Sequence, residues 1–293
     1  MTERELFSVV GMLPQPAPSA AVRRRDVPVV PLVLLGLVLL GCLCAPLLTG
    51  RDPAYMDLAN CAAAPGRQFW FGTDTMGRDI FACIWYGGRV SLAVGFLAAA
   101  ITTAIAVVYG AVSGMAAPWL DTAMMRLTEL FISVPSLLLT VFLQAFLGRI
   151  HVLSLALVIG VTGWCGMAKV VRTEVRQLRQ SGYVIACRCM GGSFWRILWR
   201  HLAPNFASSI LFMVAMSVRS AIVAESTLSF MGMGLPLETI SWGSMLALSE
   251  QGLMRGAWWI ILIPGAFLVL VLVCITAIGG WLRRRFDRRQ SNL

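Results

Sequence analysis

Few residues in this sequence have the types and spacing that catalysis or cofactor binding requires. His151 and His201 are the two histidines, and neither has a second Cys, His or carboxylate at metal-ligand spacing. The single lysine, Lys169, fails the Gly-x-x-x-x-Gly-Lys-Ser/Thr pattern that holds nucleotide phosphates. No nucleophile elbow and no pair of catalytic carboxylates is present. We therefore expect a non-catalytic chain that binds no metal or cofactor of its own.

Two charged residues, Arg219 and Glu225, interrupt a long apolar stretch. An arginine at the centre of a bilayer costs about 3 kcal/mol or more, so such a side chain should face water or a partner. Six residues apart, the two do not share a helix face. We predict that both belong to a translocation path, where Arg219 would attract a carboxylate. The alternative is an ion pair between helices, or an arginine that reaches the membrane surface from near a helix end.

A basic segment, residues 173–205, is the most patterned stretch of the chain. Apolar residues recur there at intervals of three and four between polar ones, which predicts an amphipathic helix. Gly191-Gly192 would end it, Ser193 would cap a second short helix, and Pro204 would end that one. Such a segment suits docking onto a partner protein. The alternative is a helix that lies on anionic lipid headgroups.

The elements around these residues are long and apolar. Hydrophobic residues make up 58% of the sequence, charged residues 13%, and the mean hydropathy is +0.78. A helix needs about 20 residues to cross a hydrocarbon core of about 30 Å. We predict an all-α polytopic membrane protein with six transmembrane helices. The expected spans are 27–50, 90–120, 130–148, 150–168, 206–237 and 256–282.

Basic residues set the expected topology. Seventeen of the 24 Lys and Arg fall on one side of the six spans, six fall on the other, and Arg219 lies within a span. The richer side should be cytoplasmic, with both termini on it. This accounts for the net charge of +10 and disfavours nucleic-acid binding. The predicted parts are a flexible N-terminal tail (1–26), a first helix (27–50), an extracytoplasmic segment (51–89), a five-helix core (90–282) and a basic C-terminal tail (283–293).

Local features add three expectations. The first apolar run is long for a signal peptide, so we interpret it as a retained helix, with a cleaved leader as the alternative. Pro135 should kink the third helix, on which Arg126 and Glu129 have the spacing of an i,i+3 pair. Cys61 and Cys83 fall outside the membrane, where a disulfide is chemically allowed.

Four motifs in this order resemble the inner-membrane permeases of ATP-binding-cassette importers, in particular the second permease of the dipeptide, oligopeptide and nickel group. The first is Phe71-Gly-Thr-Asp-Thr-Met-Gly-Arg-Asp79 with Tyr86-Gly-Gly-Arg-Val-Ser-Leu92. The second is the stretch from Asp121 to Pro135. The third is the basic segment, which is similar to the family's EAA loop. The fourth is Ala224-Glu-Ser-Thr-Leu-Ser-Phe-Met-Gly-Met-Gly234 with Ser241-Trp-Gly-Ser-Met-Leu246.

The resemblance implies that residues 173–205 form a coupling loop that docks in a groove of an ATPase subunit. The loop residues implied by the match are Ala186, Arg188, Gly191, Ser193, Arg196, His201, Pro204 and Asn205. The family's glutamate, its second alanine and its preceding acidic residue are replaced here by Ile185, Cys187 and Gly182. The contact with the ATPase should therefore be less polar than is usual in the family, or adapted to its own partner.

The resemblance also implies the partners and the mechanism. A second permease would complete a heterodimer, two ATP-binding subunits would hold the ATP and Mg²⁺, and an extracytoplasmic binding protein would deliver short peptides or related solutes across a bacterial inner membrane. ATP binding would then drive alternating access. The expected face for the binding protein, or a rigid lid at that face, consists of Thr73, Asp74, Gly77, Arg78, Asp79, Trp242 and Gly243. The competing hypothesis is a self-contained secondary transporter or channel. It is disfavoured because Glu129 and Glu225 are the only acidic residues in the expected helices, the third of which begins near Thr122.

Overall fold

The computed structural model describes residues 27–148, 151–180, 190, 203–236 and 238–290. Within these residues the regular structure is helical, apart from an isolated antiparallel bridge between Thr73 and Asp79. The described part of the chain therefore has the all-α architecture that the sequence predicts.

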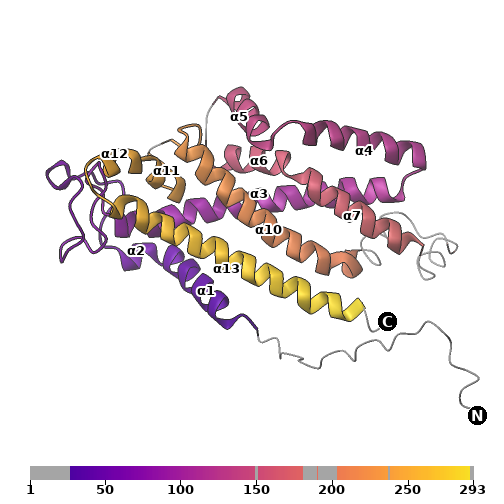
Figure 1. Ribbon diagram of the computed structural model, residues 1–293, viewed down its shortest axis with the longest axis horizontal. Coiled ribbons are helices and arrows are strands. Elements are labelled where there is room, and N and C mark those ends of the chain that lie inside the picture. Colours follow the sequence, from indigo (N-terminus) through magenta and orange to yellow (C-terminus); the bar gives the residue numbers. More distant parts are fainter. Residues whose placement is uncertain (1–26, 149–150, 181–189, 191–202, 237, 291–293) are drawn as a thin grey trace, which may run out of the picture.

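Three long helices run along the length of the molecule (Figure 1): α3 (Ile80–Met115), α10 (Ala203–Phe230) and α13 (Trp259–Gln290). The Asp79 carboxylate caps α3 by accepting a hydrogen bond from the Phe81 N–H at 3.0 Å. The 36 residues of α3 span about 54 Å at 1.5 Å per residue. The sequence places the start of this helix at residue 90, whereas α3 begins ten residues earlier, inside the stretch expected to be an external segment.

Two pairs of helices are sharply bent. The axes of α4 (Pro118–Ser133) and α5 (Ser136–Leu147) meet at 87°, and those of α6 (Val152–Thr162) and α7 (Trp164–Arg179) meet at 47°. Pro135 disfavours helical backbone at the residue before it, and Val134 accordingly has ψ 127°. The predicted kink at Pro135 is therefore a break between two helices. The predicted pair on α4 is present, with Arg126 Nη1 3.0 Å from Glu129 Oε2.

Shorter elements complete the fold. They are α1 (Val29–Leu43), α2 (Ala45–Leu48), a 3₁₀ turn (Leu58–Asn60), α11 (Trp242–Ala247) and α12 (Ser249–Met254). The expected first span, 27–50, is divided at Cys44 between α1 and α2. Cys61 and Cys83 are both free thiols.

The six predicted spans correspond to three long helices, two bent pairs and the shorter apolar helix α1. Among the described residues three single helices are long and apolar enough to cross a bilayer, and each bent pair would add one span, which makes up to five. The 15 residues of α1 fall short of the length that a perpendicular span needs. Breaks at Cys44, Pro135 and Gly163 divide runs that are continuous in hydropathy.

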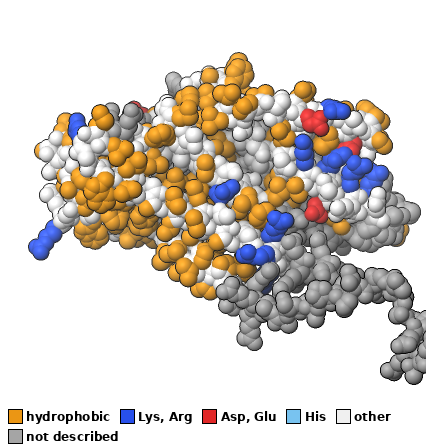
Figure 2. Space-filling model, in the orientation of Figure 1, with side chains coloured by type: hydrophobic (Ala, Val, Ile, Leu, Met, Phe, Trp, Pro, Cys, Tyr) orange, Lys and Arg blue, Asp and Glu red, His pale blue; other side chains and the backbone are white. Residues whose placement is uncertain are grey.

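The core lies around α3, which packs against α6, α7 and α10, while α10 packs against α13 and α1 packs against α3 and α13. Figure 2 shows apolar side chains over much of the visible face and a group of Lys and Arg side chains over α4 and α7. The C-terminal ends of α3, α7 and α13 and the start of α10 lie at one end of the molecule (Figure 1). The same end therefore carries both flanks of the predicted coupling loop.

Candidate functional site

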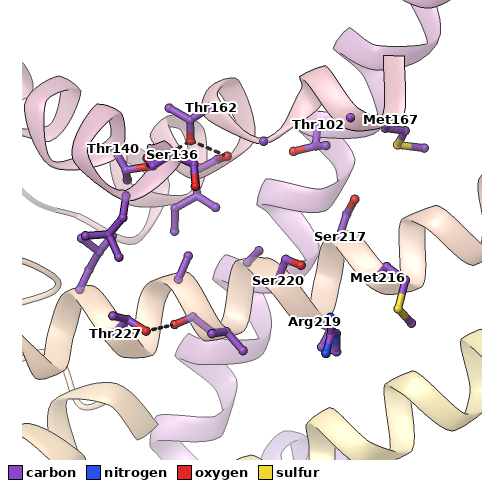
Figure 3. A pocket seen from close by; sticks show the side chains of 18 of the residues that line it. Thr102, Ser136, Thr140, Thr162, Met167, Met216, Ser217, Arg219, Ser220 and Thr227 are labelled. Carbon is purple, nitrogen blue, oxygen red and sulfur yellow. Dashed lines mark hydrogen bonds between the residues drawn. The ribbon is translucent and has the colours of Figure 1, made fainter. Parts of the chain in front are cut away.

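A cavity of about 560 Å³ lies between α10 and the helices α3, α5, α6 and α7. Hydroxyl side chains from four helices lie among its apolar lining residues (Figure 3): Thr102, Ser136, Thr140, Thr162, Ser217, Ser220 and Thr227. Thr102 Oγ1 donates to the Gly160 carbonyl oxygen at 3.0 Å, and the Thr140 and Thr162 hydroxyl oxygens are 3.1 Å apart. Such a lining offers donors and acceptors within a bundle of apolar helices. It can bind a polar solute without requiring a fixed charge.

Arg219 lies at the edge of this cavity. It is among the lining residues, but its side chain leaves α10 on the side opposite to Ser217 (Figure 3). The side chain is exposed, and it forms no ion pair with any residue that the structure describes. The ion pair that the sequence leaves open as an alternative is therefore not made within the described part of this chain.

Glu225 is fully buried and does not line the cavity. Its carboxylate accepts hydrogen bonds from the hydroxyls of Ser241 at 2.7 Å, Ser91 at 3.0 Å and Ser229 at 3.0 Å. Ser91 belongs to α3, Ser229 to α10, and Ser241 precedes α11, so one carboxylate joins three elements. The sequence predicts that Glu225 and Arg219 share one path, but of the two only Arg219 lines this cavity. The Glu225 carboxylate points into the core, where the buried serine hydroxyls stabilise its charge through the hydrogen bonds that they donate.

The predicted lid or binding-protein face is largely buried in this chain. Arg78 is 2% exposed and pairs with Asp74, with 2.7 Å between Nε and Oδ2, while Thr73 is fully buried. Gly77 has φ +77°, where a side chain would overlap the Asp57 carbonyl. Asp79 is half-buried and lies 3.5 Å from Arg51 Nη1. Burial raises the pKa of the Asp79 carboxyl, while the Phe81 N–H and Arg51 act in the opposite direction.

Trp242 and Gly243 are buried as well. The Trp242 indole donates to the Ile84 carbonyl at 3.0 Å, and its backbone N–H donates to the Ser91 hydroxyl at 3.1 Å. A Cβ at position 243 would lie 2.6 Å from the Ser226 Cα. Six of the seven predicted residues are thus buried and Asp79 is half-buried, so they offer little exposed surface in this chain. Their assignment to a lid or to a binding-protein face stays a prediction.

The coupling-loop residues Ala186, Arg188, Gly191, Ser193, Arg196 and His201 lie outside the described residues. Pro204 and Asn205 fall in the first turn of α10. The first part of the predicted loop, residues 173–179, continues α7, and Val175 is buried against α3.

Sequence reasoning missed the serines around Glu225. Ser91, Ser229 and Ser241 all stand inside motifs that carry the family resemblance, but hydroxyl residues have no spacing that predicts which carboxylate they bind.

Comparisons with known proteins agree with this architecture. The family model for the binding-protein-dependent transport system inner membrane component matches residues 106–292. An oligopeptide transport system permease protein of Bacillus subtilis is 33% identical over 267 residues, which cover 90% of this chain and 86% of the relative. A dipeptide transport system permease protein of the same organism is 35% identical over 83% of this chain and 75% of the relative. A putative peptide permease protein of Brucella suis is 35% identical over 88% of this chain and 85% of the relative.

A match of this extent, together with helices that could span a membrane several times, establishes the class of protein. The chain belongs to the family of binding-protein-dependent transport system inner membrane components, the multi-pass permease subunits of ATP-binding-cassette importers.

Proposed function

We propose that this chain is one of two permease subunits of an ATP-driven importer of short peptides. The observation that carries the proposal is the similarity, over 83–90% of this chain, to permeases named for oligopeptide and dipeptide transport. The hydroxyl-lined cavity supports it, because a peptide backbone presents alternating donors and acceptors that such a lining can bind in many registers.

A second permease would cover the face of α10 that carries Arg219. An exposed arginine on a membrane-spanning helix is costly against lipid. A second subunit that encloses an aqueous path beside α10 removes this cost. The proposed role of Arg219 is to attract the carboxylate of a peptide along that path, and the proposed role of Glu225 is to hold α3, α10 and α11 together.

The ATPase partners would dock on the coupling loop, and ATP and Mg²⁺ would be bound by them alone. The proposed location is a bacterial inner membrane with both termini in the cytoplasm. The ends of α7 and α13 at one end of the molecule support this topology, because the loop and the C-terminal tail then lie on the same side (Figure 1). An extracytoplasmic binding protein would deliver substrate to the opposite end, near α11 and α12.

The test is purification of the tagged chain from its native membrane, with and without the substitution Gly191→Asp in the coupling loop. We expect P-loop ATPase subunits to co-purify with the wild-type chain. The substitution should reduce substrate-stimulated ATP hydrolysis about tenfold, because a buried charge in a docking groove costs more than 1.4 kcal/mol.

Uptake of a labelled peptide into proteoliposomes completes the experiment. Gly36→Ala is the control, since a Cβ at this position in α1 meets nothing within 4 Å. If no ATPase co-purifies and the lone chain moves solute, the chain is a self-contained transporter and the proposal is wrong.

A further inference from the structure

A cluster of charged side chains joins three helices at the end of α7 that leads into the coupling loop. The Asp121 carboxylate, in the first turn of α4, lies 2.5 Å from both Nε and Nη2 of Arg172 on α7. Arg176, one turn further along α7, is 3.3 Å from the same carboxylate. Ser113, near the end of α3, donates its hydroxyl to Asp121 Oδ1 at 2.6 Å. One carboxylate thus receives donors from two other helices.

Asp121 and Arg172 are well placed for a strong and directional interaction. The Asp121 side chain is 9% exposed and the Arg172 side chain 22% exposed. Two parallel N–H···O bonds between a guanidinium and a carboxylate fix both the distance and the relative orientation of the groups. The pair therefore resists rotation of α7 relative to α4 as well as separation of the two helices.

Further contacts extend this attachment along α3. Arg179, the last residue of α7, has its Nη1 3.4–3.5 Å from the carbonyl oxygens of Gly114, Met115 and Ala116, where the negative end of the α3 dipole lies. On the neighbouring turns, a Cβ at Gly110 would lie 2.5 Å from the Ala168 carbonyl oxygen, and one at Gly114 would lie 2.8 Å from Val175 Cγ1. The backbones of α3 and α7 therefore approach closely and must move together.

The helix α3 connects this charged cluster with the contacts that Ser91 makes to α10 and α11. Ser91, which lies about 33 Å along α3 from Ser113, binds both Glu225 and the Trp242 backbone. Close-packed helices transmit displacement as rigid bodies. A movement of the segment that follows Arg179 would therefore reach α10 and α11 through α7 and α3.

We propose that Asp121 and Arg172 are positioning residues that couple movement of the docking loop to the helices lining the cavity. The inference rests on the proposed function, since it requires an ATPase to move the loop. Asp121 on α4 binds α7 and α3 at the same time. When the loop moves α7, this interhelical ion pair therefore moves α3 and α4 with it.

A second ion pair, which lies within α4, serves as a comparison for the Asp121–Arg172 pair. Arg126 and Glu129 on α4 are 3.0 Å apart, but their side chains are 77% and 52% exposed and both belong to one helix. This pair connects no two elements, so its loss should leave coupling unchanged.

The experiment uses the complete importer in proteoliposomes, with the binding protein and a labelled peptide, and measures peptide transported per ATP hydrolysed. With Asp121→Asn we expect the ATPase subunits to remain bound and ATP hydrolysis to continue, while the transport-to-hydrolysis ratio falls at least fivefold. Arg172→Lys, which keeps the charge and loses the two-pronged geometry, should lower the ratio by a smaller factor. The exchanged pair Asp121→Arg with Arg172→Asp should recover part of the loss, and Glu129→Gln should stay within twofold of the wild type.

The ratio separates a coupling role from a merely structural one. Asp121→Asn could reduce assembly of the complex and leave the peptide transported per ATP hydrolysed unchanged in each assembled complex. In that case the Asp121–Arg172 ion pair only stabilises the fold and the proposal is wrong. If Asp121→Asn fails to accumulate, Arg172→Lys decides, and a ratio equal to the wild type overturns the proposal. Failure of the proposed function is distinguishable, because the wild-type complex would then show no ATP-dependent uptake at all.

Discussion

At the scale of single residues, the buried carboxylate of Glu225 accepts hydrogen bonds from serines on separate elements. Its replacement in Glu225→Ala would leave the hydroxyls of Ser91, Ser229 and Ser241 without their acceptor. Each buried polar group that loses its partner costs about 1–3 kcal/mol in proteins, and less within membranes. We expect the variant to melt several degrees below the wild type in detergent, and Glu225→Gln, which keeps one acceptor, to fall in between.

Ser220→Ala on the same helix serves as the control, because Ser220 is exposed and its change should leave the melting temperature unaltered. An unchanged melting temperature for Glu225→Ala would show that the serines find other partners.

The residue scale also shows the limit of sequence reasoning. The charges at Arg219 and Glu225 mark the important stretch, yet one is exposed and the other buried, because helix phase alone does not say which face a neighbouring helix covers.

At the scale of elements, the close approach of α3 and α7 depends on Gly110. With Gly110→Ala, a Cβ 2.5 Å from the Ala168 carbonyl oxygen would force the two helices apart. Overpacking of this kind costs about 1–3 kcal/mol. We expect a lower melting temperature, and, in the assembled importer, weaker coupling through the same helix pair.

Gly166→Ala on α7 is a matched control, since a Cβ there meets nothing within 4 Å, and alanine favours the helix by about 1 kcal/mol. If both variants melt alike, the α3–α7 contact is looser than the structure indicates.

Hydropathy predicts the positions of most spans correctly, but it does not predict where they break. Val134-Pro135 and Gly163 have local backbone reasons to interrupt a helix, and their effect on direction depends on the surrounding packing.

At the scale of the whole molecule, the face of α10 that carries Arg219 indicates that this chain works as part of a larger assembly. An exposed arginine without an ion-pair partner in the described part of the chain must meet water, substrate or a partner's acidic group. A hydrogen bond to a charged group contributes about 1.5–3 kcal/mol, which corresponds to a tenfold effect or more. In the complete importer, Arg219→Gln should therefore reduce uptake of peptides with a free C-terminal carboxylate about tenfold relative to the same peptides with an amidated C-terminus.

The comparison of the two peptides isolates the permease, because the same binding protein delivers both to the wild type and to the variant. Arg219→Lys keeps the positive charge and should retain most of the preference. If Arg219→Gln lowers uptake of both peptides by the same factor, Arg219 pairs with an acidic group of the second permease and contributes to assembly. If uptake of the free-carboxylate peptide relative to the amidated peptide falls in Arg219→Gln and is retained in Arg219→Lys, the peptide carboxylate lies beside α10 during translocation, at the edge of the hydroxyl-lined cavity.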